Sequence, residues 1–180
     1  MATKRKSLLI VRSEKASTWE SCRTISSNLE RSYEALGNDF EIHWLSVPQA
    51  LEIGWIKAQT IHRLYQAIHS IRPDFLVFID HLPHPKDLLQ GLDSIDSDLQ
   101  LPPLLFHVYG DFTYYAWYWN QLNDELIGKP LRLVSASDRQ NQLIKSLITQ
   151  DAPGTTDQLF FPVDPEKFHY DPMARTQARQ

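Results

Sequence analysis

Cysteine, glycine and long apolar runs are all scarce in this 180-residue sequence, and each scarcity excludes a class of protein. The only cysteine, Cys22, has no partner in the chain, which excludes an internal disulfide and a multi-cysteine metal site. No apolar run approaches the roughly 18 residues of a transmembrane span, and no apolar segment follows the basic start as it does in a signal peptide. We therefore expect a soluble protein of the cytoplasm, with peripheral attachment to a membrane left open.

Positive charge is not in excess either. The chain has 18 Lys and Arg against 22 Asp and Glu, for a formal net charge of −4. Binding to a phosphate backbone needs a basic face, so we expect no nucleic-acid partner. With six glycines in all, the sequence also lacks the G-x-x-x-x-G-K-[ST] and G-x-G-x-x-G phosphate loops and the G-x-S-x-G nucleophile elbow.

The sequence does have enough apolar residues for a core. Leu, Ile, Val and Phe make up 50 of the 180 residues, above the roughly 20% that signals disorder. One domain is expected over residues 1–170, with 171–180 as a disordered tail or the start of a linker. Short apolar runs predict strands at Ser7–Ser13, Phe40–Val47, Phe75–Asp80, Leu104–Asp111, Leu131–Ser137 and Leu159–Val163. Apolar spacings of three and four, with capping signals, predict helices over 17–36, 61–71, 85–92, 113–126 and 137–148.

This alternation predicts an α/β fold, a Rossmann-like doubly wound parallel sheet of five to six strands with helices on both faces. Phe75–Ile79 and Leu104–Val108 are expected at its centre. Ligands of such sheets bind outside the carboxyl ends of the strands. Polar residues follow directly at four of these ends, namely Ser13–Glu14, Asp80–His81, Gly110–Asp111 and Ser135–Ser137.

Asp111 is the sharpest single candidate among them. Gly110 permits a tight turn or the close approach of a ligand, and Asp111 precedes the helix predicted over 113–126. The carboxylate can accept the proton of a hydroxyl group, or it can cap the helix by accepting hydrogen bonds from its first amides. The residues alone leave both roles open.

The same region is rich in aromatic side chains. Six of the eight residues from Phe112 to Trp119 are aromatic, and helical geometry cannot turn all of them toward the core. We expect Tyr114, with Trp117 and Tyr118, along a cleft wall or a partner surface. Flat rings suit sugar rings, nucleobases and apolar chains alike, and the alternative is that most of these rings pack in the core.

Three histidines lie near Asp80 in the sequence or in the predicted sheet. His81 and His84 flank a Leu-Pro pair, and His107 lies in the fourth predicted strand. Their spacing matches no standard ligand set, and prolines stiffen the loop against wrapping an ion. We therefore expect no metal and interpret them as ordinary histidines.

Four segments, covering roughly residues 72–170, occur in the order seen in the amino-terminal domain of GT-B glycosyltransferases of the family 4 (group 1) type. Arg72–Val77 (RPDFLV) resembles the x-P-D-hydrophobic strand of that family, and Pro103–Phe112 (PLLFHVYGDF) resembles its P-hydrophobic-x-x-x-H-D strand. Leu133–Ser137 (LVSAS) is similar to its hydrophobic-V-S-x-S strand. Leu159–Phe168 (LFFPVDPEKF) resembles its V-I-P-N-G-V-D-P-E-K-F segment.

The chain departs from the family pattern in three places. Arg12–Ser17 replaces the glycine-rich loop after the first strand, and Pro162–Asp164 shortens the Pro-Asn-Gly-Val-Asp segment. Where the family often has a histidine after its fourth strand, this chain has Tyr109 or Asp111, depending on the alignment. The identity of a catalytic base therefore does not carry over directly.

The resemblance implies the acceptor-binding half of an enzyme that transfers a sugar from a nucleotide-sugar donor to a hydroxyl of a sugar, glycolipid or glycan acceptor, with no metal or other cofactor. In the family a second Rossmann-like domain then supplies most of the donor site. Only twelve residues follow Phe168 here, so we expect this chain to lack the donor half and to be inactive by itself. The expected site residues are Asp111 and His81 as catalytic groups, with Asp80, Tyr109, Gly110, Tyr114, Trp117 and Glu14 binding substrate.

Two other classes of function remain open. In a flavodoxin-like signalling domain of the receiver type, Glu14 and Asp80 would form the acidic pocket, although the lysine expected after the fifth strand is missing. The third possibility is a non-catalytic interaction module that uses the aromatic helix.

Overall fold

The computed structural model describes residues 5–14, 20–48, 50–80, 84–109, 116–126, 129–147 and 156–159. Its strands are β1 (Lys6–Ser13), β2 (Phe40–Val47), β3 (Phe75–Ile79), β4 (Leu104–Val108), β5 (Leu131–Ser135) and β6 (Thr156–Gln158). They form one sheet in the order β2-β1-β3-β4-β5-β6, and every neighbouring pair is parallel. This architecture confirms the predicted α/β fold with β3 and β4 at its centre.

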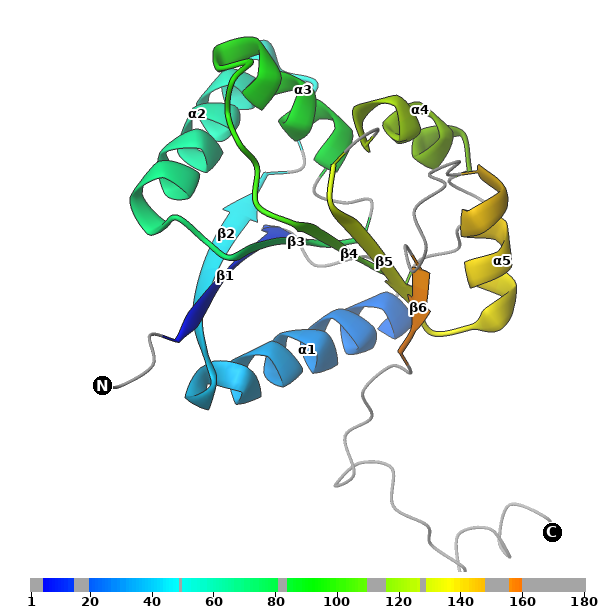
Figure 1. The fold of residues 1–180 in the computed structure, drawn as a ribbon. Helices are drawn as coiled ribbons and strands as arrows, with labels where there is room; N and C mark the ends of the chain where they lie inside the picture. Colours follow the sequence, from blue (N-terminus) through cyan, green and yellow to red (C-terminus); the bar gives the residue numbers. More distant parts are fainter. Residues whose placement is uncertain are drawn as a thin grey trace, which may run out of the picture.

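The helices cover the two faces of the sheet unequally. They are α1 (Glu20–Ala35), the short 3-10 helix η1 (Leu36–Asn38), α2 (Gly54–Ile71), α3 (Pro85–Ile95), α4 (Ala116–Leu126) and α5 (Asp138–Leu147). Helices α2 to α5 pack on one face, whereas α1 lies on the other (Figure 1). Right-handed crossovers require this division, because β1 leads back to the edge strand β2 while every later connection advances in the opposite direction.

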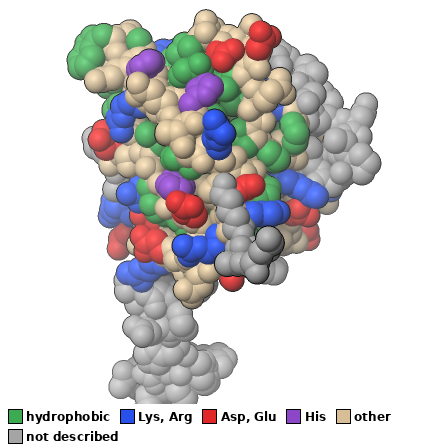
Figure 2. Space-filling model, turned by 60° about the vertical axis from the view of Figure 1, so that its left-hand side comes forward, with side chains coloured by type: hydrophobic (Ala, Val, Ile, Leu, Met, Phe, Trp, Pro, Cys, Tyr) green, Lys and Arg blue, Asp and Glu red, His purple; other side chains and the backbone are tan. Residues whose placement is uncertain are grey.

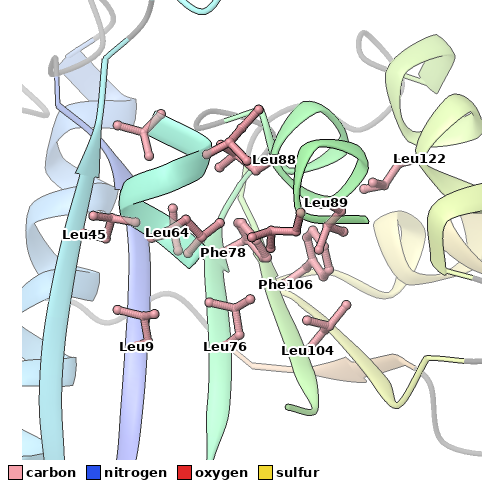
Figure 3. Packing of buried hydrophobic residues seen from close by; sticks show 14 of the residues in the cluster. Leu9, Leu45, Leu64, Leu76, Phe78, Leu88, Leu89, Leu104, Phe106 and Leu122 are labelled. Atoms are coloured by element: carbon pink, nitrogen blue, oxygen red, sulfur yellow. The ribbon is translucent and has the colours of Figure 1, made fainter. Parts of the chain in front are cut away.

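The larger core lies between the sheet and helices α2 to α5 (Figure 3). Phe78 and Phe106 stack on neighbouring strands with ring centroids 5.1 Å apart, and Trp119 of α4 meets Phe106 edge-on at 6.1 Å. All three side chains are fully buried. Each such side chain contributes on the order of 1.5–3 kcal/mol through burial, so this layer fixes the central strands that carry the candidate site.

Helices α2 and α3 approach each other closely at Gly91. A Cβ atom built there would overlap the side chain of Ile61 on α2. The missing side chain therefore permits the helix contact, although glycine costs about 1 kcal/mol relative to alanine in a helix.

The smaller core lies beneath α1. Leu29 and Tyr33 of α1 pack against Leu8 and Ile10 of β1 and against Val77 of β3. Odd- and even-numbered residues of a strand face opposite sides of the sheet, so β1 and β3 contribute apolar side chains to both cores. This two-sided burial explains why both strands are continuous apolar runs in the sequence.

The Pro-Asp pair before β3 has a structural role at the amino end of the sheet. The Asp74 carboxylate accepts hydrogen bonds from the backbone N–H of Ser7 at 2.8 Å and from its hydroxyl at 3.3 Å. The Asp74 amide donates in turn to the Ser7 carbonyl at 2.9 Å. Asp74 thus fixes the start of β1 to the start of β3, at the edge opposite the strand ends expected to carry function.

Several element boundaries differ from those predicted. Strand β4 ends at Val108 rather than Asp111, and α2 begins at Gly54, seven residues before its predicted stripe. Strand β6 lies at Thr156–Gln158, before the predicted 159–163, of which residues 160–163 lie outside the described part of the chain. The start of α5 is confirmed, since the Gln140 amide donates to the Ser137 hydroxyl at 3.2 Å.

The surface that faces the viewer in Figure 2 carries charges of both signs. Figure 2 shows Lys and Arg intermixed with Asp and Glu over the lower half of this view. Among the described helices, none is long and apolar enough to cross a membrane.

Candidate functional site

The carboxyl ends of β1, β3 and β4 lie at the point where the connections after β1 and β3 leave the sheet toward opposite faces. Strand β1 lies between β2 and β3, and the helix after β1 covers one face of the sheet while the helix after β3 covers the other (Figure 1). Open α/β sheets bind ligands in the crevice at such a switch point, outside the carboxyl ends of the strands. The residues at the ends of β1, β3 and β4 are therefore the place to look for chemistry.

Asp80 is the first residue after β3 and is only 3% exposed. Its φ of 63° lies in the left-handed region, which ends the strand there. Aspartate tolerates this conformation better than most residues, but it still carries strain of about 1 kcal/mol. The Asp80 amide donates to the carbonyl of His107 at 2.9 Å, which ties this strained residue to β4.

His107 is buried in β4, with 3% of its surface exposed. The even-numbered side chains of β4 enter the larger core, so the imidazole points to the α1 face. There its Nδ1 lies 3.4 Å from the hydroxyl of Tyr33, within hydrogen-bond distance. Its Nε2 is buried and has no hydrogen-bond partner among the described residues.

The protonation of this histidine follows from its burial. Desolvation lowers the pKa of His107 to about 4, while the negative charge of Asp80 acts in the opposite direction. Burial also raises the pKa of Tyr33 to about 12. At neutral pH the pair is therefore a neutral imidazole beside a protonated phenol.

Tyr109, one residue past β4, joins Asp80 to the inner face of α1. Burial raises the pKa of the Tyr109 phenol, and the nearby charge of Asp80 raises it further. Cys22 and Glu30 of α1 add to this effect, and a hydrogen bond with Ser26 opposes it. The fold thus brings a carboxylate, a phenol and polar side chains of α1 into one region.

An ion pair closes this cluster on the β2 side. Arg12 of β1 lies 2.8 Å from the Glu30 carboxylate and also stacks over Trp44 of β2, 4.8 Å from the ring centroid. Trp44 in turn meets the Tyr33 ring edge-on at 6.3 Å. These contacts hold α1 in a fixed position relative to β1 and β2, and so fix the side chains that α1 presents to the site.

Tyr118 reaches the same region from the opposite face of the sheet. Its hydroxyl accepts a hydrogen bond from the Lys86 amide at 3.0 Å, in the first turn of α3, where a helix has free N–H groups. Burial raises the pKa of Tyr118, and the hydrogen bond from Lys86 lowers it. The negative charges of Asp87 and Asp80 raise it further. The Asp80 charge therefore raises the pKa of tyrosines on both faces of the sheet.

The described residues resolve only part of the predicted site. Asp80 and Tyr109 come together as just described. Glu14 is exposed and its amide donates to the Val47 carbonyl, on the β2 side of β1. Trp117 is 62% exposed on α4, on the face opposite α1. Four candidates, His81, Gly110, Asp111 and Tyr114, lie outside the described residues.

His107 is the site residue that sequence reasoning missed. From the sequence, His107 is predicted to lie in a strand and is interpreted as an ordinary histidine. The structure buries it beside Asp80. The available signal was its position inside the apolar run LLFHV of a central strand, which is covered on both faces. A histidine at such a position has to be buried whichever way it points.

A surface hollow lies elsewhere in the described part of the chain. It encloses about 500 Å³ near Arg72, Asp74 and Pro103, at the amino ends of the strands. Ligands of parallel sheets bind at the other edge, so we assign the candidate site by its chemistry and topology. In the described part of the chain, no three His, Cys, Asp or Glu side chains are grouped so that they could hold a metal ion.

Fold and site together define a doubly wound α/β protein with a buried polar cluster at its topological switch point. Its neutral imidazole, carboxylate and phenol are groups that bind and orient hydroxyls. No family model matches the sequence, and no curated protein matches it significantly.

Proposed function

We propose that this chain is the acceptor-binding domain of a nucleotide-sugar-dependent glycosyltransferase of the GT-B type. The observation that carries the proposal is the buried cluster of Asp80, His107 and Tyr109 at the carboxyl edge of a doubly wound parallel sheet. The four ordered segments that resemble this family supply the second line of support. In this proposal a separate nucleotide-binding domain holds the donor, and no metal ion takes part.

The chemistry of the cluster fits a hydroxyl acceptor. A sugar hydroxyl is a poor nucleophile until its proton is accepted or shared, and carboxylates at the strand ends can accept it. Asp111 is our first candidate for this contact and His81 the second, with Asp80 and Tyr109 binding the acceptor beside them. Aromatic side chains such as Tyr114 and Trp117 would orient the sugar ring.

The receiver-type alternative is less well supported by the same geometry. Strand β5 ends at Ser135, which donates to Asn141 at 2.6 Å, and no lysine follows it there. Labelling of Asp80 by acetyl phosphate would nevertheless establish that function and refute ours.

The direct test is sugar transfer. We expect the protein in which this chain is joined to its nucleotide-binding domain to transfer sugar from a nucleotide sugar to a hydroxyl acceptor. Residues 1–180 alone should not do so, because two domains must close over the donor and exclude water. Failure of the two-domain protein with all common nucleotide sugars and glycan acceptors would contradict the proposal.

The role of Asp111 can be separated from helix capping. Asparagine caps a helix about as well as aspartate, so Asp111→Asn should leave the unfolding midpoint unchanged. If the carboxylate accepts the acceptor proton, kcat should fall by about 100-fold or more. The matched control is Asp138→Asn, an exposed acidic residue in the first turn of α5. Full activity of Asp111→Asn would remove Asp111 from the site.

A further inference from the structure

We propose that Asp80 and His107 together bind one hydroxyl group of an uncharged sugar acceptor, and that Tyr33 is the positioning residue that fixes the imidazole. This inference rests on the proposed function and specifies its acceptor: a neutral glycoside, rather than a sugar phosphate, at the switch point.

Among the described residues, only one nitrogen of the His107 imidazole has a hydrogen-bond partner. In the β3–β4 register His107 lies opposite Ile79, which is the residue directly before the strained Asp80. Its Nδ1 faces the Tyr33 hydroxyl, whereas Nε2 has no partner among the described residues. A buried polar atom without a partner destabilises the folded protein, and a ligand hydroxyl would remove this cost on binding.

The Tyr33 hydroxyl keeps its proton far above neutral pH, so it can donate to Nδ1 or accept from Nδ1–H. In the inferred arrangement it donates, and the imidazole proton sits on Nε2. The edge-on contact between the two rings, with centroids 6.3 Å apart, restricts rotation of the imidazole. Nε2–H is therefore presented as a donor.

Asp80 supplies the complementary acceptor. Its amide bonds to the His107 carbonyl at 2.9 Å and its side chain is buried, so Asp80 lies in the same buried region as the imidazole; its charge acts on both His107 and Tyr109. A hydroxyl group can donate its proton to the carboxylate while its oxygen accepts from Nε2–H. A phosphate group offers mainly acceptors and would be repelled by the Asp80 charge in this poorly solvated region. The pair therefore selects neutral hydroxyls.

The experiment measures sugar binding to the full 180-residue chain by NMR titration. The probes are the methyl glycosides of glucose, galactose and mannose, and the 6-phosphates of the same three sugars. We expect at least one methyl glycoside to bind, with weaker binding of its 6-phosphate. His107→Leu should weaken glycoside binding about tenfold, the equivalent of one lost hydrogen bond.

Three variants make the result specific. His107→Gln places an amide nitrogen near the position of Nε2 and should restore most of the lost affinity, which a merely structural role would not predict. Tyr33→Phe should shift the ring ¹⁵N resonances of His107 away from the Nε2–H tautomer and weaken binding by a smaller factor. The control, His62→Leu, alters an exposed histidine of α2 and should bind as the wild type does.

The outcomes distinguish a failure of the inference alone from a failure of the proposed function. Equal glycoside binding by the wild type and His107→Leu would overturn the inference and leave the acceptor-binding function intact. Tighter binding of the 6-phosphates would overturn the inference in the same way. If none of the six sugars binds the wild type, both the inference and the acceptor-binding function are refuted.

Discussion

Burial of His107 makes the stability of this protein sensitive to acid. In the unfolded chain a histidine has a pKa near 6.5, and in the folded protein desolvation lowers the pKa of His107 to about 4. A group whose pKa is lower in the folded state binds its proton preferentially in the unfolded state. The contribution of His107 is therefore intact above about pH 6.5 and is lost as the pH falls toward 4.

The expected magnitude follows from the size of this shift. The pKa of His107 falls from 6.5 to about 4, and one pKa unit corresponds to 1.36 kcal/mol. Full protonation would thus cost about 3 kcal/mol of unfolding free energy. Between pH 7 and pH 5 the same linkage predicts a loss of about 2 kcal/mol, a large share of the 5–15 kcal/mol typical of a domain.

Urea unfolding of wild type and His107→Leu at pH 7, 6 and 5 tests this reasoning. The five tryptophans provide a fluorescence signal. The leucine variant has no proton to gain, so it should lose about 2 kcal/mol less than the wild type between pH 7 and pH 5. The control His62→Leu, at an exposed position, should follow the wild type. Parallel pH curves for wild type and His107→Leu would refute the argument.

Three further substitutions test the packing around the site. Gly91→Ala should lower the unfolding free energy by about 1 kcal/mol, because overlap with the Ile61 side chain outweighs the gain in helix propensity. A stabilised variant would show that α2 and α3 can move apart to make room for the methyl group. Tyr118→Phe removes the acceptor for a backbone amide in the first turn of α3 and should cost about 1 kcal/mol in urea unfolding; an unchanged midpoint would mean that another group takes its place. Asp74→Ala leaves the amide of Ser7 without its carboxylate and should cost about 1–3 kcal/mol, whereas an unaffected midpoint would show that β1 and β3 need no such connection.

The sequence by itself was sufficient for the architecture. The apolar runs at Phe75–Ile79 and Leu104–Val108 predict central parallel strands, and the structure places both there. The prediction succeeded because both faces of these strands are covered, so every residue of the run has to tolerate burial. The pairing of Ser137 with Gln140 correctly marked the start of α5 because capping depends on neighbouring residues alone.

Boundaries that depend on contacts between distant segments were less predictable. Strand β3 stops at Ile79 because Asp80 adopts a left-handed conformation and bonds to β4. Helix α2 begins seven residues before its apolar stripe, and Lys57 near its start forms an ion pair with Asp87 of α3. Local sequence patterns contain no information on these contacts.

The polar cluster was decided by the tertiary structure. The sequence identified Asp80 as a polar strand end, and the family resemblance pointed to Tyr109. Only the sheet order places them beside α1 and its residues Cys22, Ser26 and Glu30. The role of His107 depends on a hydroxyl 74 residues away in the chain, that of Tyr33. Composition and periodicity report whether a residue is buried, whereas the partner of a buried polar atom is chosen by the way helices and strands pack together.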